Sequence, residues 1–396
     1  MKKAFRVIFV CLWAAVCIAL ILMLADWHFG AFQWSEFQFG GFQMNNWSIR
    51  GGVSLKSELI YQESVSSRDM ERLEVKAYSE SVRVFAVDGG EFAVRQYGPV
   101  DTLREELVRV SREDGVLRVI MPARTVVQIG VFFANPRLEI DVPREWFGGV
   151  DISTSSGSQT LEDGFSWKSA SLGASSGAVR LLGPLTLEGA AQVSASSGSV
   201  RLQDLTAASA ALKTTSGALT VEGRLTLTGN LEAAASSGSV RLNRTEAAQV
   251  QVSANSGALH LGEMKAESVR ARTSSGSLRA VTLETASFDL QTNSGGIHVG
   301  ALTGGGRLKA TSGTVTVLTL RPTGNVDARA SSGGVRLTIP EDCSFTFEAR
   351  CSSGRIRSDY ALYYQGRNER AAAYTHGGGG PAVSAETTSG SIRLGK

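Results

Sequence analysis

The pair Ser-Gly, preceded each time by Ser, Thr or Asn, occurs twelve times in the second part of this 396-residue chain. The glycines of the first eleven pairs lie 18 to 21 residues apart. A fixed period of this length is typical of a solenoid, in which each repeat buries its apolar face only against its neighbours. The repeated glycines are Gly157, Gly177, Gly198, Gly217, Gly238, Gly257, Gly276, Gly295, Gly313, Gly333, Gly354 and Gly390.

Each repeat shows an alternation of apolar and polar residues on both sides of the glycine. In one copy the apolar or small positions are Leu231, Ala233, Ala235, Val240 and Leu242. Alternation predicts two short strands with one inward face each. The inward positions on the two sides of the Ser-Gly pair are separated by an odd interval, so the chain must turn a corner there. We expect the glycine to supply a positive φ at the corner, and the hydroxyl and amide side chains to satisfy corner backbone groups.

The period also selects among the β folds. A helical repeat and a six-residue left-handed β-helix do not fit it, and near-identical units are not expected of a two-sheet sandwich. The 44 glycines against 8 prolines favour tight turns between short strands. We therefore predict an all-β fold, a single-stranded parallel β-helix of about twelve coils, roughly 60 Å long at about 4.8 Å per coil. Right-handed winding is the default for parallel crossovers.

The repeats define the domain boundaries. Residues 150–396 form the predicted β-helix. Residues 56–149 are predicted to be a β-rich N-terminal cap whose segment 73–85 fits the repeat template as a degenerate first coil, with Glu80 in the place of the glycine. A longer excursion at 358–388 separates the last two Ser-Gly pairs. It holds four of the seven tyrosines and is either a cap over the last coil or a loop that contacts a ligand.

The N-terminus has the pattern of a membrane anchor. Lys2, Lys3 and Arg6 precede an uncharged apolar run of 19 residues from Val7 to Ala25. As a helix this run would span roughly 28 Å, close to the hydrocarbon core of a bilayer. Residues 1–25 are thus predicted to be a cytoplasmic tip and a single transmembrane helix, with the rest of the chain on the extracytoplasmic side. A cleaved signal peptide is the alternative, although the run is long for one.

Aromatic residues recur every five positions in the following segment, residues 26–55, at Phe32, Phe37, Phe42 and Trp47. We expect this juxtamembrane segment to lie among lipid headgroups, where aromatic rings with some polar character partition well. An adhesive or oligomerising strip is the alternative.

One outward position, three residues after each glycine, is enriched in basic residues and is never acidic. Like charges at strand spacing repel unless an anion or an acidic neighbour offsets them. This column is therefore the candidate binding site for an anionic polymer, which guanidinium groups would hold through phosphates or carboxylates. The alternative is a solvated face that keeps the solenoid soluble. The candidate residues are Arg180, Arg201, Arg241, His260, Arg279, His298, Arg336, Arg357 and Arg393.

Other chemistry is not indicated. Twelve copies of Ser-Gly cannot all be nucleophiles, and no H-E-x-x-H, S-x-x-K or P-loop pattern is present. His260 and His298 lie two coils apart, which is too far for one metal ion. A net charge of +3 does not indicate nucleic-acid binding. We predict no catalytic residues, no metal, no cofactor and no enzymatic activity.

The chain resembles a bacterial family of candidate adhesins, β-strand-repeat proteins of unknown function related to membrane proteins of cell-envelope-stress operons in Gram-positive bacteria. The resemblance begins in the segment RLEIDVPREWFGGVDISTSSGSQTL, residues 137–161, and continues to TTSGSIRL at 387–394. It implies a β-helix, an envelope location and no catalytic residues. Many relatives carry an acidic residue directly after the glycine, which this chain lacks.

These observations together predict a membrane-anchored protein that presents a rigid β-helix outside the cell as a non-catalytic binding, adhesion or structural module. Its expected partners are membrane lipid, through the N-terminal helix and the aromatic segment, and anionic envelope polymers or another envelope protein. An accessory or sensory role in an envelope-stress system is the second hypothesis. An enzyme acting on polysaccharide is the third.

Overall fold

The computed structural model describes residues 48–51, 57–99, 102–122, 126–129, 136–365 and 370–396. The predicted transmembrane helix at 1–25, and the aromatic segment as far as Trp47, lie outside the described residues. Within them, no helix is long and apolar enough to cross a membrane. Contacts divide the chain into two units. In the first, β1 (Ser48–Gly51) pairs in parallel with β8 (Val126–Ile129).

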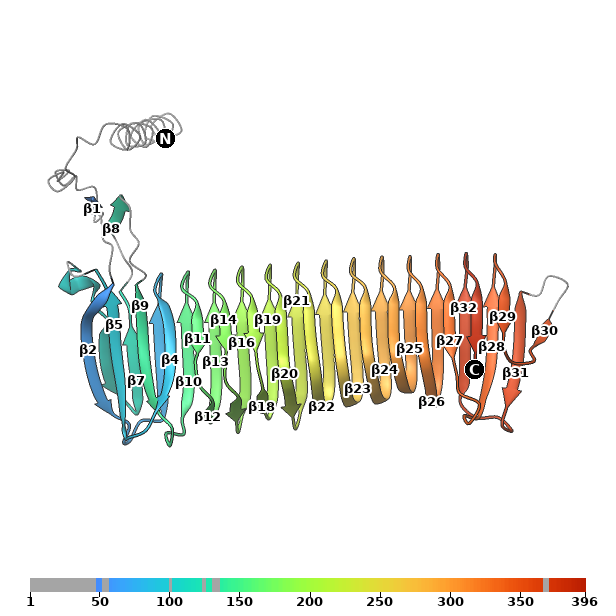
Figure 1. Ribbon diagram of the computed structural model, residues 1–396, viewed down its shortest axis with the longest axis horizontal. Coiled ribbons are helices and arrows are strands. Elements are labelled where there is room, and N and C mark those ends of the chain that lie inside the picture. Colours follow the sequence, from blue (N-terminus) through green and yellow to red (C-terminus); the bar gives the residue numbers. More distant parts are fainter. Residues whose placement is uncertain (1–47, 52–56, 100–101, 123–125, 130–135, 366–369) are drawn as a thin grey trace, which may run out of the picture. The chain divides into compact units, whose positions relative to one another are not determined.

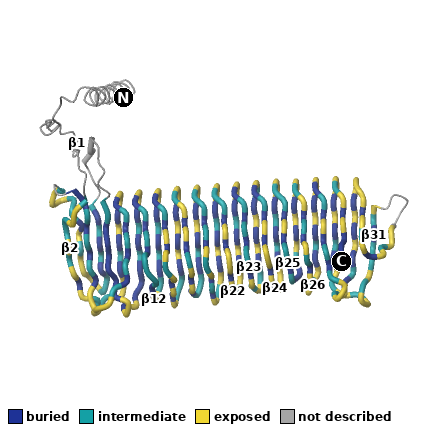
Figure 2. Tube along the Cα trace, viewed as in Figure 1, coloured by how far each residue is buried: buried dark blue, intermediate teal, exposed yellow. Residues whose placement is uncertain are grey.

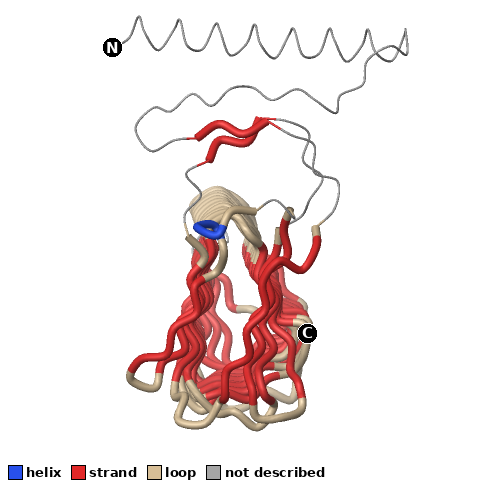
Figure 3. Tube along the Cα trace, turned by 90° about the vertical axis from the view of Figure 1, so that its left-hand side faces the viewer, coloured by secondary structure: helices blue, strands red, loops and turns tan. Residues whose placement is uncertain are grey.

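The second unit is a parallel β-solenoid whose coils stack side by side (Figure 1). Each coil has three faces, which can be followed in the end-on view of Figure 3. We name them the pre-corner face, which leads into the Ser-Gly corner (for example Val150–Thr154), the post-corner face, which follows it (Gln159–Leu161), and the third face (Phe165–Trp167). Strands on each face pair in parallel with the same strand of the next coil.

In the first coils each face is a separate strand, whereas from β22 to β26 one long strand continues around all three faces. The strands are β10 (Gly149–Thr154), β11 (Gln159–Leu161), β12 (Phe165–Trp167), β13 (Ser169–Ala174), β14 (Val179–Leu181), β15 (Leu185–Leu187), β16 (Ala190–Ala195), β17 (Val200–Leu202), β18 (Leu205–Ala207), β19 (Ser209–Thr214), β20 (Leu219–Leu227), β21 (Asn230–Ala235), β22 (Val240–Ala254), β23 (Leu259–Thr273), β24 (Leu278–Thr292), β25 (Ile297–Ala310), β26 (Val315–Ala330) and β27 (Val335–Thr338).

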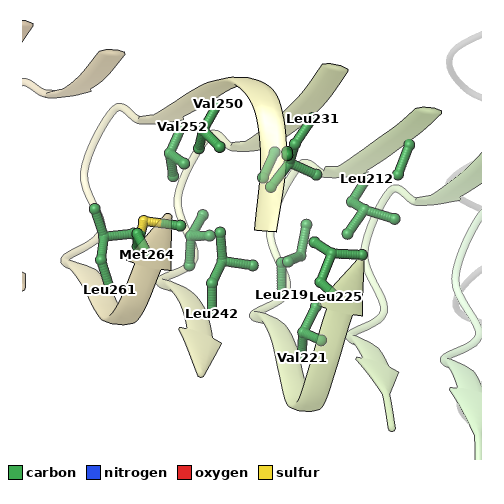
Figure 4. Close-up of a cluster of buried hydrophobic side chains, with 14 of the residues drawn as sticks. Leu212, Leu219, Val221, Leu225, Leu231, Leu242, Val250, Val252, Leu261 and Met264 are labelled. Carbon is green, nitrogen blue, oxygen red and sulfur yellow. The ribbon is translucent and has the colours of Figure 1, made fainter. Parts of the chain in front are cut away.

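The predicted inward positions form the core. Leu231, Ala233, Ala235, Val240 and Leu242 are all buried. Side chains from successive coils fill the interior in layers, as Figure 4 shows for the coils around β20 to β23. The alternation of buried and exposed positions along every coil is visible in Figure 2. Each coil therefore buries its apolar side chains against the coils on both sides of it, as a solenoid requires.

The reason for glycine at the corners differs from the prediction. Among the twelve corner glycines only Gly354 has a positive φ, of 133°. The others are required because successive corners approach too closely for a side chain: a Cβ on Gly177 would lie 2.0 Å from the carbonyl oxygen of Gly157. Buried threonines support several corners; the Thr154 hydroxyl donates to the carbonyl of Gly157 at 2.7 Å. The expectation of positive φ was wrong, and close backbone approach explains the glycine instead.

The N-terminal part of the solenoid contains the segment 73–85. β3 (Arg72–Ala77) pairs in parallel with β10, and β4 (Ser81–Val87) pairs with β11. Glu80 occupies the corner position below Gly157. No Ser-Gly corner precedes Glu80, so a side chain is tolerated there. The remaining elements are β2 (Glu58–Ser66), β5 (Glu91–Gly98), the short 3-10 helix η2 (Arg104–Glu106), β6 (Arg109–Glu113), β7 (Val116–Ile120) and β9 (Arg137–Pro143).

The C-terminal coils do not follow sequence order, and this corrects the predicted count of about twelve coils. Nine turns follow one another directly, from Val150 to Val326. Beyond them, β28 (Phe345–Cys351) and β29 (Ile356–Ser358) leave a gap of one layer. The end of the chain, β32 (Ala382–Thr387) and β33 (Ile392–Gly395), fills this gap by pairing with β26 and β27 on one side and β28 and β29 on the other.

Antiparallel strands cover the outer edge of the last layer. β31 (Ala371–His376) pairs with β28 and with β30 (Tyr363–Gln365), and both come from the excursion between residues 358 and 388. Phe345, Tyr360, Tyr374 and His376 form an aromatic cluster beside them, and the Tyr360 hydroxyl donates to the carbonyl of Ile339 at 2.7 Å. At the other end, β2 pairs antiparallel with β5, and β5 with β9. Antiparallel strands thus cover the parallel strand edges at both ends, which limits pairing of the parallel layers with other chains.

Candidate functional site: the arginine column

The candidate basic residues form one column along the post-corner face. All but Arg357 lie between two buried apolar residues, as Arg201 lies between Val200 and Leu202, so their side chains point outward. The register places each of them directly opposite its counterpart in the next coil. In spatial order the arginine column is Arg83, Thr160, Arg180, Arg201, Thr220, Arg241, His260, Arg279, His298, Thr316, Arg336, Arg393 and Arg357.

The spatial order differs from the sequence order at the C-terminal end. Because β33 inserts between β27 and β29, Arg393 pairs with Arg336 on one side and Arg357 on the other. We name Arg336, Arg393 and Arg357 the arginine triad. It is the longest uninterrupted run of arginines in the column. Sequence order alone, which places Arg357 before Arg393, could not show which residue is in the middle.

Most arginines of the column have no acidic partner. Arg83 pairs with Glu162, Arg201 with Glu222 at 3.2 Å and Arg393 weakly with Asp359 at 3.9 Å. In the described part of the chain no carboxylate lies within ion-pair distance of the other five, which are Arg180, Arg241, Arg279, Arg336 and Arg357. All five are exposed to solvent. These guanidinium groups are therefore available to an external anion.

The pre-corner face shows the opposite arrangement. Most of its basic side chains pair with acidic neighbours, often across coils: Lys213 with Glu232 at 2.9 Å, Arg272 with Asp289 at 2.8 Å, and Arg329 with Asp327 at 2.8 Å. Further pairs join Arg270 to Asp289 and Arg307 to Asp327. Exposed ion pairs of this kind contribute little to stability, but they cancel the local charge. The arginines without an acidic partner are thus more numerous on the post-corner face than on the pre-corner face.

The pKa of His260, in the middle of the column, is influenced by the positive charges on both sides of it. Partial burial and then the positive charges of Arg241 and Arg279 hold the pKa of His260 below its ordinary value of 6.5. The two arginines are its direct neighbours in the adjoining coils. An anion bound between them would remove this repulsion.

A second surface feature was not predicted from the sequence. An open groove of about 710 Å³ runs along the edge of the pre-corner face over six successive coils. Its lining positions share no single residue type, so no repeated motif marks it. Only the register of the coils brings these residues into one line.

In the portion of the chain that the structure describes, no group of three His, Cys, Asp or Glu side chains could hold a metal ion. Gly173 to Gly177 fits the G-x-S-x-G pattern of hydrolase nucleophiles, but Ser175 lies in a solenoid corner, where its backbone N–H donates to the carbonyl of Thr154. The coils on either side contain no histidine that could act as its base.

The fold and the column define a class: a parallel β-solenoid with stacked Ser-Gly corners and one strongly basic face. The family model described as Toastrack DUF4097 matches the chain over residues 70–230 and again over 224–395. The chain belongs to the Toastrack DUF4097 family.

Several solved structures are similar to the chain. One is a candidate adhesin from Parabacteroides merdae, with 12% identity over 88% of this chain and 99% of that chain, at a TM-score of 0.38. Another is a candidate adhesin from Parabacteroides distasonis, with 12% identity over 69% of this chain and 99% of that chain, at a TM-score of 0.36. No curated protein matches the chain.

Proposed function

We propose that the protein is a non-catalytic binding module of the cell envelope, and that its arginine column holds an anionic polymer that runs along the solenoid. The observation that carries this proposal is the contrast between the two faces. Four arginines on the pre-corner face, Arg270, Arg272, Arg307 and Arg329, are paired with acids, whereas five on the post-corner face have no acidic partner in the described part of the chain.

The geometry suits a linear polymer. Column residues follow one another at the coil spacing of about 4.8 Å, so a chain of phosphates or carboxylates lying parallel to the solenoid axis would meet a basic side chain at most steps. Guanidinium groups bind both anions through paired hydrogen bonds. The threonines and histidines that interrupt the column add hydrogen-bonding groups without adding acidic charge.

The proposal includes a location. The charged, then apolar, pattern of residues 1–25 supports a single-pass anchor that places the solenoid outside the cytoplasmic membrane. Lipid contact by the aromatic segment 26–55 belongs to the same proposal. An anchored solenoid would display the column to polymers of the envelope.

The test is a binding measurement on the full chain in a non-ionic detergent, with inorganic polyphosphate and polygalacturonate as probes at two salt concentrations. One variant changes Arg180, Arg241, Arg279 and Arg336 to Ser. The matched control changes Arg270, Arg272, Arg307 and Arg329 to Ser, which removes the same charge from the pre-corner face.

We expect salt-sensitive binding that falls at least about tenfold in the first variant and less than about threefold in the control, because charge–charge attraction is screened by salt and depends on position. Equal losses in both variants would show attraction by net charge alone. The proposal fails if wild type binds neither probe.

A further inference from the structure

The groove on the pre-corner face has the same profile in each of six coils. Three consecutive positions line it in every coil, beginning with Ala190, Ser209, Asn230, Gln249, Ser268 and Ser287. The register aligns these positions from one coil to the next. Five coil intervals make the groove roughly 24 Å long. A groove of constant profile and this length suits an extended chain parallel to the solenoid axis.

Polar groups without partners line both sides of the groove. Along one side lie Ser209, Asn230, Gln249, Ser268 and Ser287, and along the other lie Gln192 and Gln251. None of their side chains hydrogen-bonds to another described residue. The floor between them consists of buried apolar residues such as Leu231 and Val250. Side-chain amides and hydroxyls both donate and accept hydrogen bonds, as the hydroxyl groups of a sugar do.

Each charged residue that lines the groove is paired with an opposite charge. Glu232 pairs with Lys213 at 2.9 Å, and Asp289 pairs with Arg270 and Arg272. Burial alone would raise the pKa of Asp289, but hydrogen bonds from Gln291 and Arg272 hold it below its ordinary value, so the ion pairs persist. Unlike the arginine column, the groove offers no unpaired charge to recruit a polyanion.

A peptide is a poorer occupant than a sugar chain. Peptides that bind β-sheets usually add a strand to a free edge and bond through the backbone. The groove lies on the face of a sheet whose strands pair with neighbours on both sides, so no free backbone edge faces it. Recognition there must go through side chains.

From this combination of shape, free amides and hydroxyls, and cancelled charge, we propose that the groove binds an extended, uncharged polysaccharide strand. The groove lies on a different face from the arginine column. The inference does not depend on the proposed polyanion binding, and either one can fail without the other.

The test measures binding of cello-oligosaccharides and chito-oligosaccharides, as di-, tetra- and hexasaccharides, to the full chain by calorimetry. Ala211→Trp places a bulky ring inside the groove, since Ala211 lines it. Ala234→Trp is the matched control, because Ala234 also points outward on this face and lies outside the lining. Circular dichroism checks that both variants fold.

We expect affinity for at least one series to rise with chain length, to fall at least about tenfold in Ala211→Trp, and to stay within about twofold in Ala234→Trp. A second variant, Gln249→Ala with Gln251→Ala, removes two hydrogen-bonding groups without adding bulk and should weaken binding about three- to tenfold. The proposal is overturned if no oligosaccharide binds wild type, if both Trp variants bind equally well, or if only an uncharged extended peptide competes for the groove.

Discussion

At a Ser-Gly corner, one added methyl group is enough to prevent neighbouring coils from stacking. A Cβ on Gly177 would lie 2.0 Å from a backbone oxygen of the previous coil, whereas a Cβ on Gly173, four residues earlier, would meet only the Ser194 hydroxyl at 3.6 Å. Backbone cannot move aside as the end of a flexible side chain can. The repeated glycine is therefore a packing requirement between coils.

This contrast predicts the outcome of two alanine substitutions in one coil. Gly177→Ala should lower the free energy of unfolding by at least about 2 kcal/mol, because the added methyl forces neighbouring coils apart. Gly173→Ala, the matched control, should change it by less than about 1 kcal/mol, because its strand position has room. Urea unfolding followed by circular dichroism measures both. Equal effects would mean that close approach is not the reason for the glycine.

His260 offers a reporter inside the arginine column. We predict that polyphosphate binding raises the pKa of His260, because bound phosphate offsets the charges of Arg241 and Arg279. Binding then takes up protons, and affinity should increase as the pH falls through the range below 6.5. An NMR titration of the His260 ring with and without polyphosphate measures the shift. The double variant Arg241→Ser with Arg279→Ser should raise the pKa of His260 without any ligand.

The lowered pKa of His260 also determines how the stability of the protein changes with pH. The folded-state pKa of His260 lies below the ordinary value, so between these two values the unfolded chain binds more protons than the folded protein. Stability therefore decreases as the pH falls through this range. A titration curve of His260 that polyphosphate leaves unchanged would contradict anion binding at the centre of the column.

Among the elements, the C-terminal pair β32 and β33 has the most unusual position. It is the last segment of the chain, yet it lies between two layers made earlier. Val383, Ala385, Ile392 and Leu394 are all buried there. The linker before it, residues 377–380, consists of four glycines, three of which have positive φ. The insertion also supplies Arg393, the middle residue of the arginine triad.

Removal of residues 382–396 should therefore do more than shorten the protein. It leaves the strand edges of β26 and β28 unpaired, and such edges promote association between chains. We predict a lower melting temperature and concentration-dependent oligomers in size-exclusion chromatography. Removal of Lys396 alone is the control and should leave the elution volume and the melting temperature close to those of wild type. A truncated protein that melts and elutes like wild type would show that the inserted strands are dispensable.

At the scale of the whole molecule, the sequence period was sufficient for the fold class and for the inward face. Positions such as Leu231 and Val240 are buried as predicted, because alternation around a fixed corner determines which side chains share a face. The period also placed the arginine column correctly as a line of outward positions. A fixed period means that the coils resemble one another, so equivalent positions of successive coils can be aligned from the sequence.

The same period could not reveal the order of the last coils. Gly354 and Gly390 fit the template equally well, and the 35 residues between them do not say which one stacks on Gly333. The structure stacks Gly390 on Gly333 and Gly354 on Gly390. The groove was missed for a related reason, since Ala190, Asn230 and Ser287 share a location but no chemistry that repeats in the sequence.

The inserted strands also determine when folding can be completed. Coils from Val150 to Val326 can dock in the order in which the chain is synthesised, each on the one before it. The layer formed by β28 and β29 has no parallel strand neighbour until β32 and β33 arrive, and these two strands come later in the sequence. Closure of the solenoid therefore waits for strands that are synthesised later, which must enter a space already bounded on both sides.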